Sequence, residues 1–410
     1  MNLSGTRLNF ISNFLYIGVL KFVNIGSKYI LVGYLIRVLG ENGYGTLTWV
    51  DAIVQYFIML INFGFDLYAA KYVVENKNNP KKLNEAISAI YYIKGILFLM
   101  SFILLLTLTF NTEINTVINL IILMMVMGIG EVLTPIWFFQ GIEKMKTITV
   151  ITFFSKLILV LLTFFFIKNS NDINLYILFL VFTNIIWGFF GFLMMKKEAN
   201  FKFVAVTFQL IKNYLKEGYL FFIGKFSTFL FNLGTVFLIG YLFTKGQVAG
   251  FDIAIKIVFV FIIPFEVLQQ ALFPVIVRGV RKSELRKITV ATFIISTATA
   301  VLLYFFSENV IVIFGGTEMY KYSYVLDLVS VLIPIVSLTI VVGNCILVAK
   351  GYYKQYNWSL IVSAMVFVSL LIVLKTTDQL NFLNVILIRV LADFIQLLIR
   401  FYYNFKFKII

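Results

Sequence analysis

Positively charged side chains lie inside stretches of this sequence that are otherwise apolar enough to enter a lipid bilayer. Lys21, Asn24 and Lys28 are spaced by three and four residues, which places them on one face of a helix. A Lys or Arg at the middle of a spanning helix costs roughly 2.5 to 3.5 kcal/mol on insertion scales, so such side chains usually face protein or water. A face of this kind is suited to binding an anion in a polar cavity inside the membrane.

A second copy of this pattern begins near Lys225. Asn232-Leu-Gly-Thr and Gly240-Tyr-Leu correspond to Asn24-Ile-Gly-Ser and Gly33-Tyr-Leu in the first half. We interpret the chain as a duplicated bundle with an N-terminal lobe at residues 1–200 and a C-terminal lobe at 201–410, joined by a basic connector at about 196–216.

The composition places the chain among membrane proteins, because 61% of its 410 residues are hydrophobic. Its net charge of +15 is spread over short loops instead of one polar domain, so we expect no nucleic-acid partner. Cys345 is the only cysteine and histidine is absent, which removes the commonest metal ligand and the usual general base. We therefore expect neither a cofactor nor a bound metal, and no enzymatic activity.

Apolar runs of about 20 residues each predict an all-α integral membrane protein with twelve transmembrane helices. Lys and Arg concentrate in alternate loops, which predicts that both termini are cytoplasmic. Trp49, Trp137 and Trp358 stand near span ends and are expected to anchor the protein at the membrane interface. The predicted spans are 10–36, 47–67, 86–108, 117–138, 147–167, 174–195, 218–242, 251–273, 289–306, 325–349, 357–374 and 381–402.

The cations within these spans have two interpretations. Asp252 with Lys256 and Arg389 with Asp393 are four residues apart, so local pairing explains them as well as a binding role does. The other candidates have no acidic neighbour one helical turn away, which favours a shared cavity for an anion. The candidate cavity cations are Lys21, Lys28, Lys94, Lys156, Lys256 and Arg389, with Asn24 and Asn232 as polar lining.

Acidic residues in the spans could instead couple transport to an ion. Glu131 lies about two turns from one end of its predicted span, and a buried carboxyl can take up a proton or a small cation. An equally good interpretation makes Glu131 the partner of a buried lysine. Asp66 and Asp393 are further candidates for ion coupling.

A resemblance to a known family rests on two segments of the first half. The segment from Pro135 to Lys146, PIWFFQGIEKMK, follows the segment from Phe63 to Lys71, FGFDLYAAK. Together they resemble the Wzx-type polysaccharide flippases, which belong to the multidrug/oligosaccharidyl-lipid/polysaccharide (MOP) exporter superfamily. Further family-like residues in the second half are Phe226-Ser-Thr, Gly250-Phe-Asp-Ile-Ala, Gln270-Ala-Leu-Phe-Pro and Phe314-Gly.

The resemblance implies a V-shaped, MATE-like pair of six-helix lobes around a central cationic cavity in the bacterial inner membrane. It implies a flippase that carries undecaprenyl-pyrophosphate-linked oligosaccharide repeat units outward by alternating access, for O-antigen or other surface polysaccharide. Expected partners are this substrate, membrane lipids, a proton or sodium ion, and a polysaccharide polymerase with its chain-length regulator. A drug/ion antiporter of the same superfamily and a membrane polysaccharide polymerase or glycosyltransferase are the alternative functions.

The topology can be tested by labelling single cysteines from either side of the membrane, after Cys345 has been replaced. Alternation of the basic loops predicts which positions face the cytoplasm. An odd number of spans, with the termini on opposite sides, would contradict both the topology and the duplication. We expect labelling from inside at Asn76, Asn200, Lys282 and Lys406, and from outside at Asn111, Lys245 and Tyr320.

Overall fold

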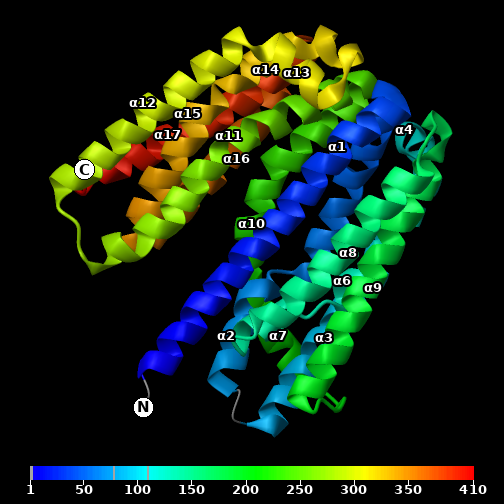
Figure 1. Cartoon of the computed structure of the whole chain (residues 1–410), viewed down its shortest axis with the longest axis vertical. Helices are drawn as coiled ribbons and strands as arrows, with labels where there is room; N and C mark the ends of the chain where they lie inside the picture. The colour runs from blue at the N-terminus through cyan, green and yellow to red at the C-terminus, as the bar shows by residue number, and fades with distance from the viewer. Residues whose placement is uncertain (1–2, 77–78, 109) are drawn as a thin grey trace. The chain divides into compact units, whose positions relative to one another are not determined.

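The computed structural model describes the backbone at residues 3–76, 79–108 and 110–410, and most side chains from Gly18 onward. The described residues form helices joined by short connections, with no strand among them (Figure 1). The predicted all-α class is therefore confirmed.

The first half of the chain begins with the longest helix, α1, and ends in a connection to α10. Its elements are α1 (Leu3–Asn62), α2 (Phe65–Asn76), α3 (Pro80–Leu108), α4 (Thr112–Asn115), α5 (Ile118–Met125), α6 (Met127–Leu133), α7 (Ile136–Gly141), α8 (Met145–Phe166), η1 (Ser170–Asp172) and α9 (Ile173–Ala199).

The described part of the second half contains as many helical elements as that of the first half. They are α10 (Phe208–Leu242), α11 (Lys245–Arg278), α12 (Lys282–Phe305), α13 (Ser307–Gly315), η2 (Thr317–Tyr322), α14 (Ser323–Ser330), α15 (Leu332–Thr339), the π-helix η3 (Ile340–Leu347), α16 (Tyr353–Thr376) and α17 (Phe382–Lys406).

Ten helices in the described parts of the chain are long and apolar enough to cross a membrane. This number is compatible with the twelve predicted spans, because α1 combines the first two of them across a kink at Gly40. Gly40 has a φ of 71°, a conformation that glycine adopts without steric cost. Among the described residues of α10, Asn232–Leu242 forms an apolar stretch that is shorter than a full span.

Two predicted spans are interrupted helices. The stretch predicted at 117–138 consists of α5, α6 and α7, and the chain leaves the helical conformation at Thr134 and Pro135. Proline lacks the backbone donor that a continuous helix needs. Pro264, in contrast, lies within the continuous helix α11. The stretch predicted at 325–349 is divided among α14, α15 and the π-helix η3.

The chain forms two compact units. Unit 1 comprises Met1–Leu39 and Val50–Phe226, and unit 2 comprises Gly40–Trp49 and Ser227–Ile410. The two repeated six-helix lobes at 1–200 and 201–410 stay a prediction, as does the central cavity that the resemblance implies.

An aromatic core holds unit 1 together. Trp137, Phe138 and Phe139 of α7 are 0–1% exposed and pack with residues of α2, α3 and α9. The segment on which the family resemblance rests therefore contributes to the core. Trp137 is not an interface anchor, and neither is Trp49, which is fully buried in unit 2. The prediction was wrong for both because nearness to a span end does not show whether a side chain faces lipid or protein.

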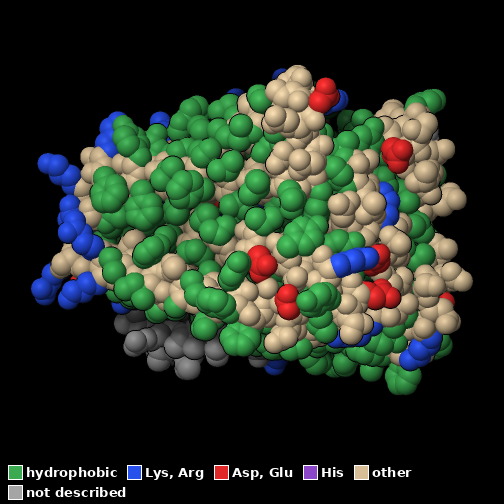
Figure 2. Space-filling view, turned by 90° about the horizontal axis from the view of Figure 1, so that it is seen from above, with side chains coloured by type: hydrophobic (Ala, Val, Ile, Leu, Met, Phe, Trp, Pro, Cys, Tyr) green, Lys and Arg blue, Asp and Glu red, His purple; other side chains and the backbone are tan. Residues whose placement is uncertain are grey.

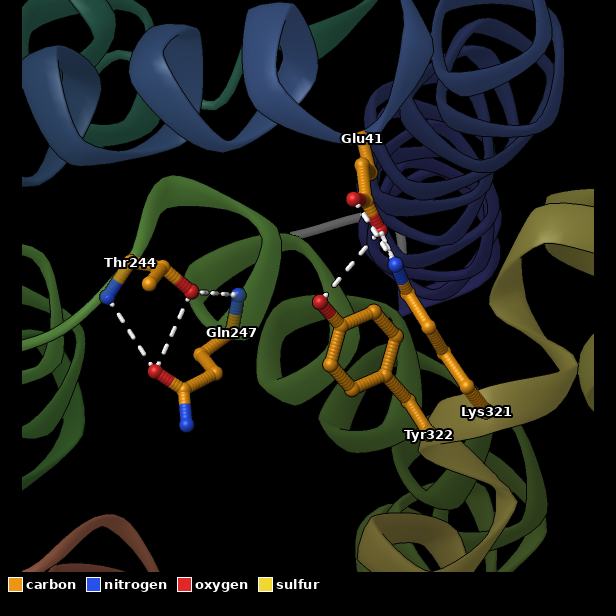
Figure 3. A network of polar contacts seen from close by, with 5 residues as sticks. All are labelled: Glu41, Thr244, Gln247, Lys321 and Tyr322. Atoms are coloured by element: carbon orange, nitrogen blue, oxygen red, sulfur yellow. Dashed lines mark hydrogen bonds and ion pairs between the residues drawn. The ribbon is translucent and has the colours of Figure 1, made fainter.

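The segment Gly40–Trp49 is fastened to the rest of unit 2 by polar contacts. Glu41 pairs with Lys321 at 2.7 Å and accepts a hydrogen bond from the Tyr322 hydroxyl at 3.3 Å, next to the capped start of α11 at Thr244 (Figure 3). The Trp49 ring donates to the Phe237 carbonyl at 3.1 Å and lies 3.4 Å from the Lys245 ammonium. This short segment thus belongs to unit 2, although the chain on both sides of it belongs to unit 1.

Candidate functional site

The carboxylate of Glu131 is the centre of a polar site inside unit 1. Its two oxygens each accept a hydrogen bond of 3.2 Å, one from the amide of Asn62 and one from the amide of Asn184. These donors come from α1 and α9, whereas Glu131 lies on α6. Three helices that are remote in sequence therefore fix the position of this carboxylate.

Glycines allow α6 and α9 to approach closely enough for this contact. A Cβ atom added at Gly130 would lie 2.0 Å from Oδ1 of Asn184, and one added at Gly188 would lie 2.3 Å from the Gly130 carbonyl oxygen. Small residues permit such close crossings between membrane helices. The sequence MGIGE on α6 thus brings Glu131 within reach of the Asn184 amide.

Lys94 of α3 supports the same turn of α6. Its side chain is 2% exposed, and its ammonium donates to the backbone carbonyl of Glu131 at 2.7 Å. The carbonyls near the end of α6 lack helical partners because the helix stops before Pro135, so a buried cation can bond to them. The predicted cavity cation Lys94 is thus in contact with the backbone at this break.

A polar cavity of about 230 Å³ opens beside Glu131 in unit 1. Asn24 of α1 and Lys156 of α8 line it together with Glu131, so three residues predicted to be functional meet here. The cavity exceeds the roughly 30 Å³ that one water occupies in the liquid, so several waters, or part of a polar ligand, would fit. Its remaining polar walls include Gln55, Thr152, Ser155, Thr183 and Asn184.

The charges around the cavity act on Lys156. Glu131 and Asp51 attract its ammonium, whereas Lys28 repels it. Among the described residues, no hydrogen bond or ion pair connects Lys156 to a neighbour. The Lys28 side chain is exposed. The ammonium of Lys156 is therefore available to a ligand, and an anion would also relieve its repulsion with Lys28.

Two predicted cavity cations of unit 2, Lys256 and Arg389, are in a different situation, because each has a carboxylate partner. Arg389 pairs with Asp393 and also donates to Oδ1 of Asn232 at 2.6 Å, and both members of the pair are at most 5% exposed. Lys256 pairs with Asp252 and donates to the Tyr44 hydroxyl at 2.8 Å. For both pairs the structure shows the local pairing that the sequence left open.

Arg400 of α17 is a buried cation that sequence reasoning missed. It is 1% exposed and donates to the Thr339 carbonyl at 2.8 Å, to Oδ1 of Asn344 at 3.1 Å and to the Ser359 hydroxyl at 3.0 Å. It fills the space beside the π-helix η3, where a Cβ added at Gly343 would lie 2.3 Å from its Nη1 atom. Its place near the end of a predicted span gave no signal that it would be buried.

Sequence reasoning also missed the amides that hold Glu131. Asn62 and Asn184 are amide residues within apolar stretches, and this was the feature from which a polar contact could have been predicted. The side chains of Lys21 and Asp66 lie outside the described residues, so their roles remain predictions.

A family model described as "Polysaccharide biosynthesis protein" matches residues 10–280, and the chain belongs to this family. A protein of Escherichia coli (strain K12) named "Putative O-antigen transporter" is 24% identical over 389 residues, which cover 92% of each chain. A protein of the same name from Shigella dysenteriae is 23% identical over 60% of this chain and 62% of its own.

Solved structures show that the fold is that of MOP transporters. The lipid II flippase MurJ in an inward closed conformation matches with a TM-score of 0.73 and 13% identity, over 94% of this chain and 87% of that one. A multidrug resistance MATE family transporter in an inward-facing conformation matches with a TM-score of 0.69 and 11% identity, over 97% and 98%. The predicted resemblance and the membrane-helix fold class are confirmed.

The pair of Arg389 and Asp393 allows a test of buried charge in unit 2. Asp393→Leu should destabilise the protein by about 3 to 5 kcal/mol, because it leaves Arg389 buried without its carboxylate. The double variant Arg389→Met/Asp393→Leu should lose much less stability than the single variant. Thermal unfolding of the purified variants in detergent measures both effects, and a double variant that is as unstable as the single one would contradict the interpretation.

Proposed function

We propose that the protein is a flippase that moves polyprenyl-pyrophosphate-linked oligosaccharide repeat units from the cytoplasmic to the outer leaflet of the bacterial inner membrane. The observation that carries this proposal is the cavity in unit 1, in which Lys156 has no ion-pair partner among the described residues. Membership of the polysaccharide biosynthesis family and the fold shared with a lipid II flippase support it.

The chemistry of the substrate fits such a cavity. A pyrophosphate head with its sugars cannot cross hydrocarbon without polar partners, whereas a polyprenyl tail can remain in lipid. Lys156 in the cavity lining and Lys28, which lies near enough to repel it, supply positive charge, and Asn24, Gln55 and Asn184 supply groups that bond to hydroxyls. Lys21, which shares the helix face of Lys28, is proposed to contact the same head group.

Two alternatives are less well supported. A drug exporter for cationic compounds would be expected to have an anionic cavity, but here Lys156 lines the same cavity as Glu131 and interacts with both Glu131 and Asp51. A polysaccharide polymerase or glycosyltransferase usually needs a long extramembrane loop for sugar chemistry, and the described helices are joined by short connections. We propose a transporter, not an enzyme, acting with a polymerase and its chain-length regulator.

Glu131 is proposed to couple the return of the empty carrier to a proton or a sodium ion. Once the anion has left, the empty carrier returns, and the exposure of Lys28 and Lys156 to water changes while no anion neutralises them. Moving such uncompensated charges is unfavourable in a medium of low dielectric constant. Glu131 faces the same cavity and is held by neutral amides. In the described part of the chain, Glu131 forms no ion pair with Lys156. It can therefore exchange a proton or bind a small cation without first breaking such a pair.

The first functional test removes the cavity cations. Lys28→Ala/Lys156→Ala should abolish export of the polysaccharide while leaving the amount of protein in the membrane near normal. The matched control is Lys71→Ala, which removes an exposed lysine paired with Glu75 and should retain activity. Export is measured by complementation of a strain that lacks its flippase, and full activity of the double variant would refute the role of these lysines.

The second functional test neutralises the carboxylate. Glu131→Gln keeps the size of the side chain but removes its charge, so it should reduce transport more than substrate binding and weaken the response to a pH or sodium gradient. Glu75→Gln, at an exposed site, is the control. Transport in proteoliposomes with imposed gradients provides the measurement. An unchanged gradient dependence in Glu131→Gln would assign Glu131 a purely structural role.

A further inference from the structure

Each unit has an apolar groove on its surface with one cation among its lining residues. The groove of unit 2 has a volume of about 410 Å³ and that of unit 1 about 450 Å³. Both fall in the range of ligand sites, roughly 300 to 1,000 Å³. Neither groove includes a residue of the polar cavity around Glu131 except Ser155, which lines both the cavity and the groove of unit 1.

The groove of unit 2 runs between α12 and α17. Phe293, Phe394 and Phe405 line it and are 42–60% exposed, so the groove is open to the surroundings of the protein. Arg286, in the second turn of α12, is the one charged residue among the described residues that line it. Arg286 is also the first lining residue along α12, which places the cation at one end of the apolar residues that this helix contributes.

Further basic residues lie at that end of the groove. Besides Arg286, the stretch from Arg278 to Lys287 contains four basic residues and one acidic residue, Glu284, and Lys406 ends α17. Figure 2 shows Lys and Arg side chains gathered toward the left edge of the surface, next to wide areas of hydrophobic side chains. A positively charged end and an apolar trough together match an amphiphilic anion.

The groove of unit 1 repeats this design with different helices, α8 and α9. Val150, Phe154 and Phe190 line it and are 42–55% exposed. Lys146, at the start of α8, is the one charged residue that lines it in the described part of the chain. The exposed Lys196 and Lys197 follow Met194, another lining residue, near the end of α9. Lys144 is close in sequence but pairs with Glu198 and does not line the groove.

We propose that each groove binds one anionic phospholipid of the surrounding bilayer, with an acyl chain in the apolar trough and the phosphate at Arg286 or Lys146. The charge of the groove ends selects an anionic head group, and basic pockets between membrane helices are known to bind such lipids. Exposed phenylalanines and aliphatic side chains along each trough match a hydrocarbon chain, not a sugar. Lipids in these sites contact α8, α9, α12 and α17 from outside the polar cavity.

The test counts bound lipids by native mass spectrometry of the intact protein in detergent. Dioleoyl phosphatidylglycerol is compared with dioleoyl phosphatidylcholine, and a dihexanoyl phosphatidylglycerol arm separates head-group binding from chain binding. The wild type should retain up to two molecules of the dioleoyl anionic lipid and clearly fewer of either other lipid. The variant Lys146→Gln/Arg286→Gln should bind the anionic lipid about fivefold more weakly at each groove.

A matched control removes two cations that do not line the grooves. Lys144→Gln/Lys375→Gln, in which Lys375 lies in the last turn of α16 and lines neither groove, should bind the anionic lipid like the wild type, and unfolding temperatures would confirm that both variants are folded. Equal retention of the two dioleoyl lipids, or equal loss in both variants, would overturn the proposal. Retention of a polyprenyl phosphate without retention of phosphatidylglycerol would also overturn it, because the grooves would then belong to the substrate. None of these outcomes depends on transport activity, so they leave the proposed flippase function to its own tests.

Discussion

The cost of burying charge without water is the constraint on which this structure depends. A membrane protein can keep a Lys or Arg within its spans only if protein groups or water replace the lost hydration. A backbone carbonyl replaces the hydration of Lys94, and Asp393 and Asn232 replace that of Arg389. Arg400 donates to a carbonyl, an amide oxygen and a hydroxyl. The breaks in the helices matter because they provide some of these carbonyls.

The two units meet this constraint in different ways. In unit 2, Lys256 and Arg389 are each neutralised by a carboxylate one helical turn away. In unit 1, Lys156 faces a polar cavity, and Glu131 is held by two neutral amides. Burying a cation beside a cavity without a carboxylate partner costs free energy, so its presence there indicates a role in binding a ligand. A buried ion pair that is neutral overall is explained by structure alone. Unit 1 is therefore where we expect the anionic head group to be recognised.

Local sequence patterns predicted the local features of this protein. The four-residue spacing of Asp252 and Lys256 made local pairing one of the two interpretations that the sequence left open, and the structure shows this pairing. Proline alone does not determine where a span is interrupted: the chain leaves the helical conformation at Pro135, whereas Pro264 lies within a continuous helix, which a membrane helix can accommodate. The amides of Asn62 and Asn184 could not be assigned to Glu131, since the contact depends on how α1, α6 and α9 cross. The burial of Trp137 and Arg400 likewise depends on neighbours that are remote in sequence.

The central claim is that the protein itself moves a lipid-linked oligosaccharide across a membrane. The most direct measurement reconstitutes the purified protein into liposomes that carry a fluorescent polyprenyl-pyrophosphate oligosaccharide and follows access of a membrane-impermeant quencher to the label. A potential should drive the dianionic head toward the positive side, by about 2.3 kcal/mol per charge per 100 mV. We predict that label from the protected leaflet becomes accessible only in liposomes containing the protein, and faster under such a potential. If the label in the protected leaflet stays as inaccessible to the quencher as it is in protein-free liposomes, this result would contradict the account.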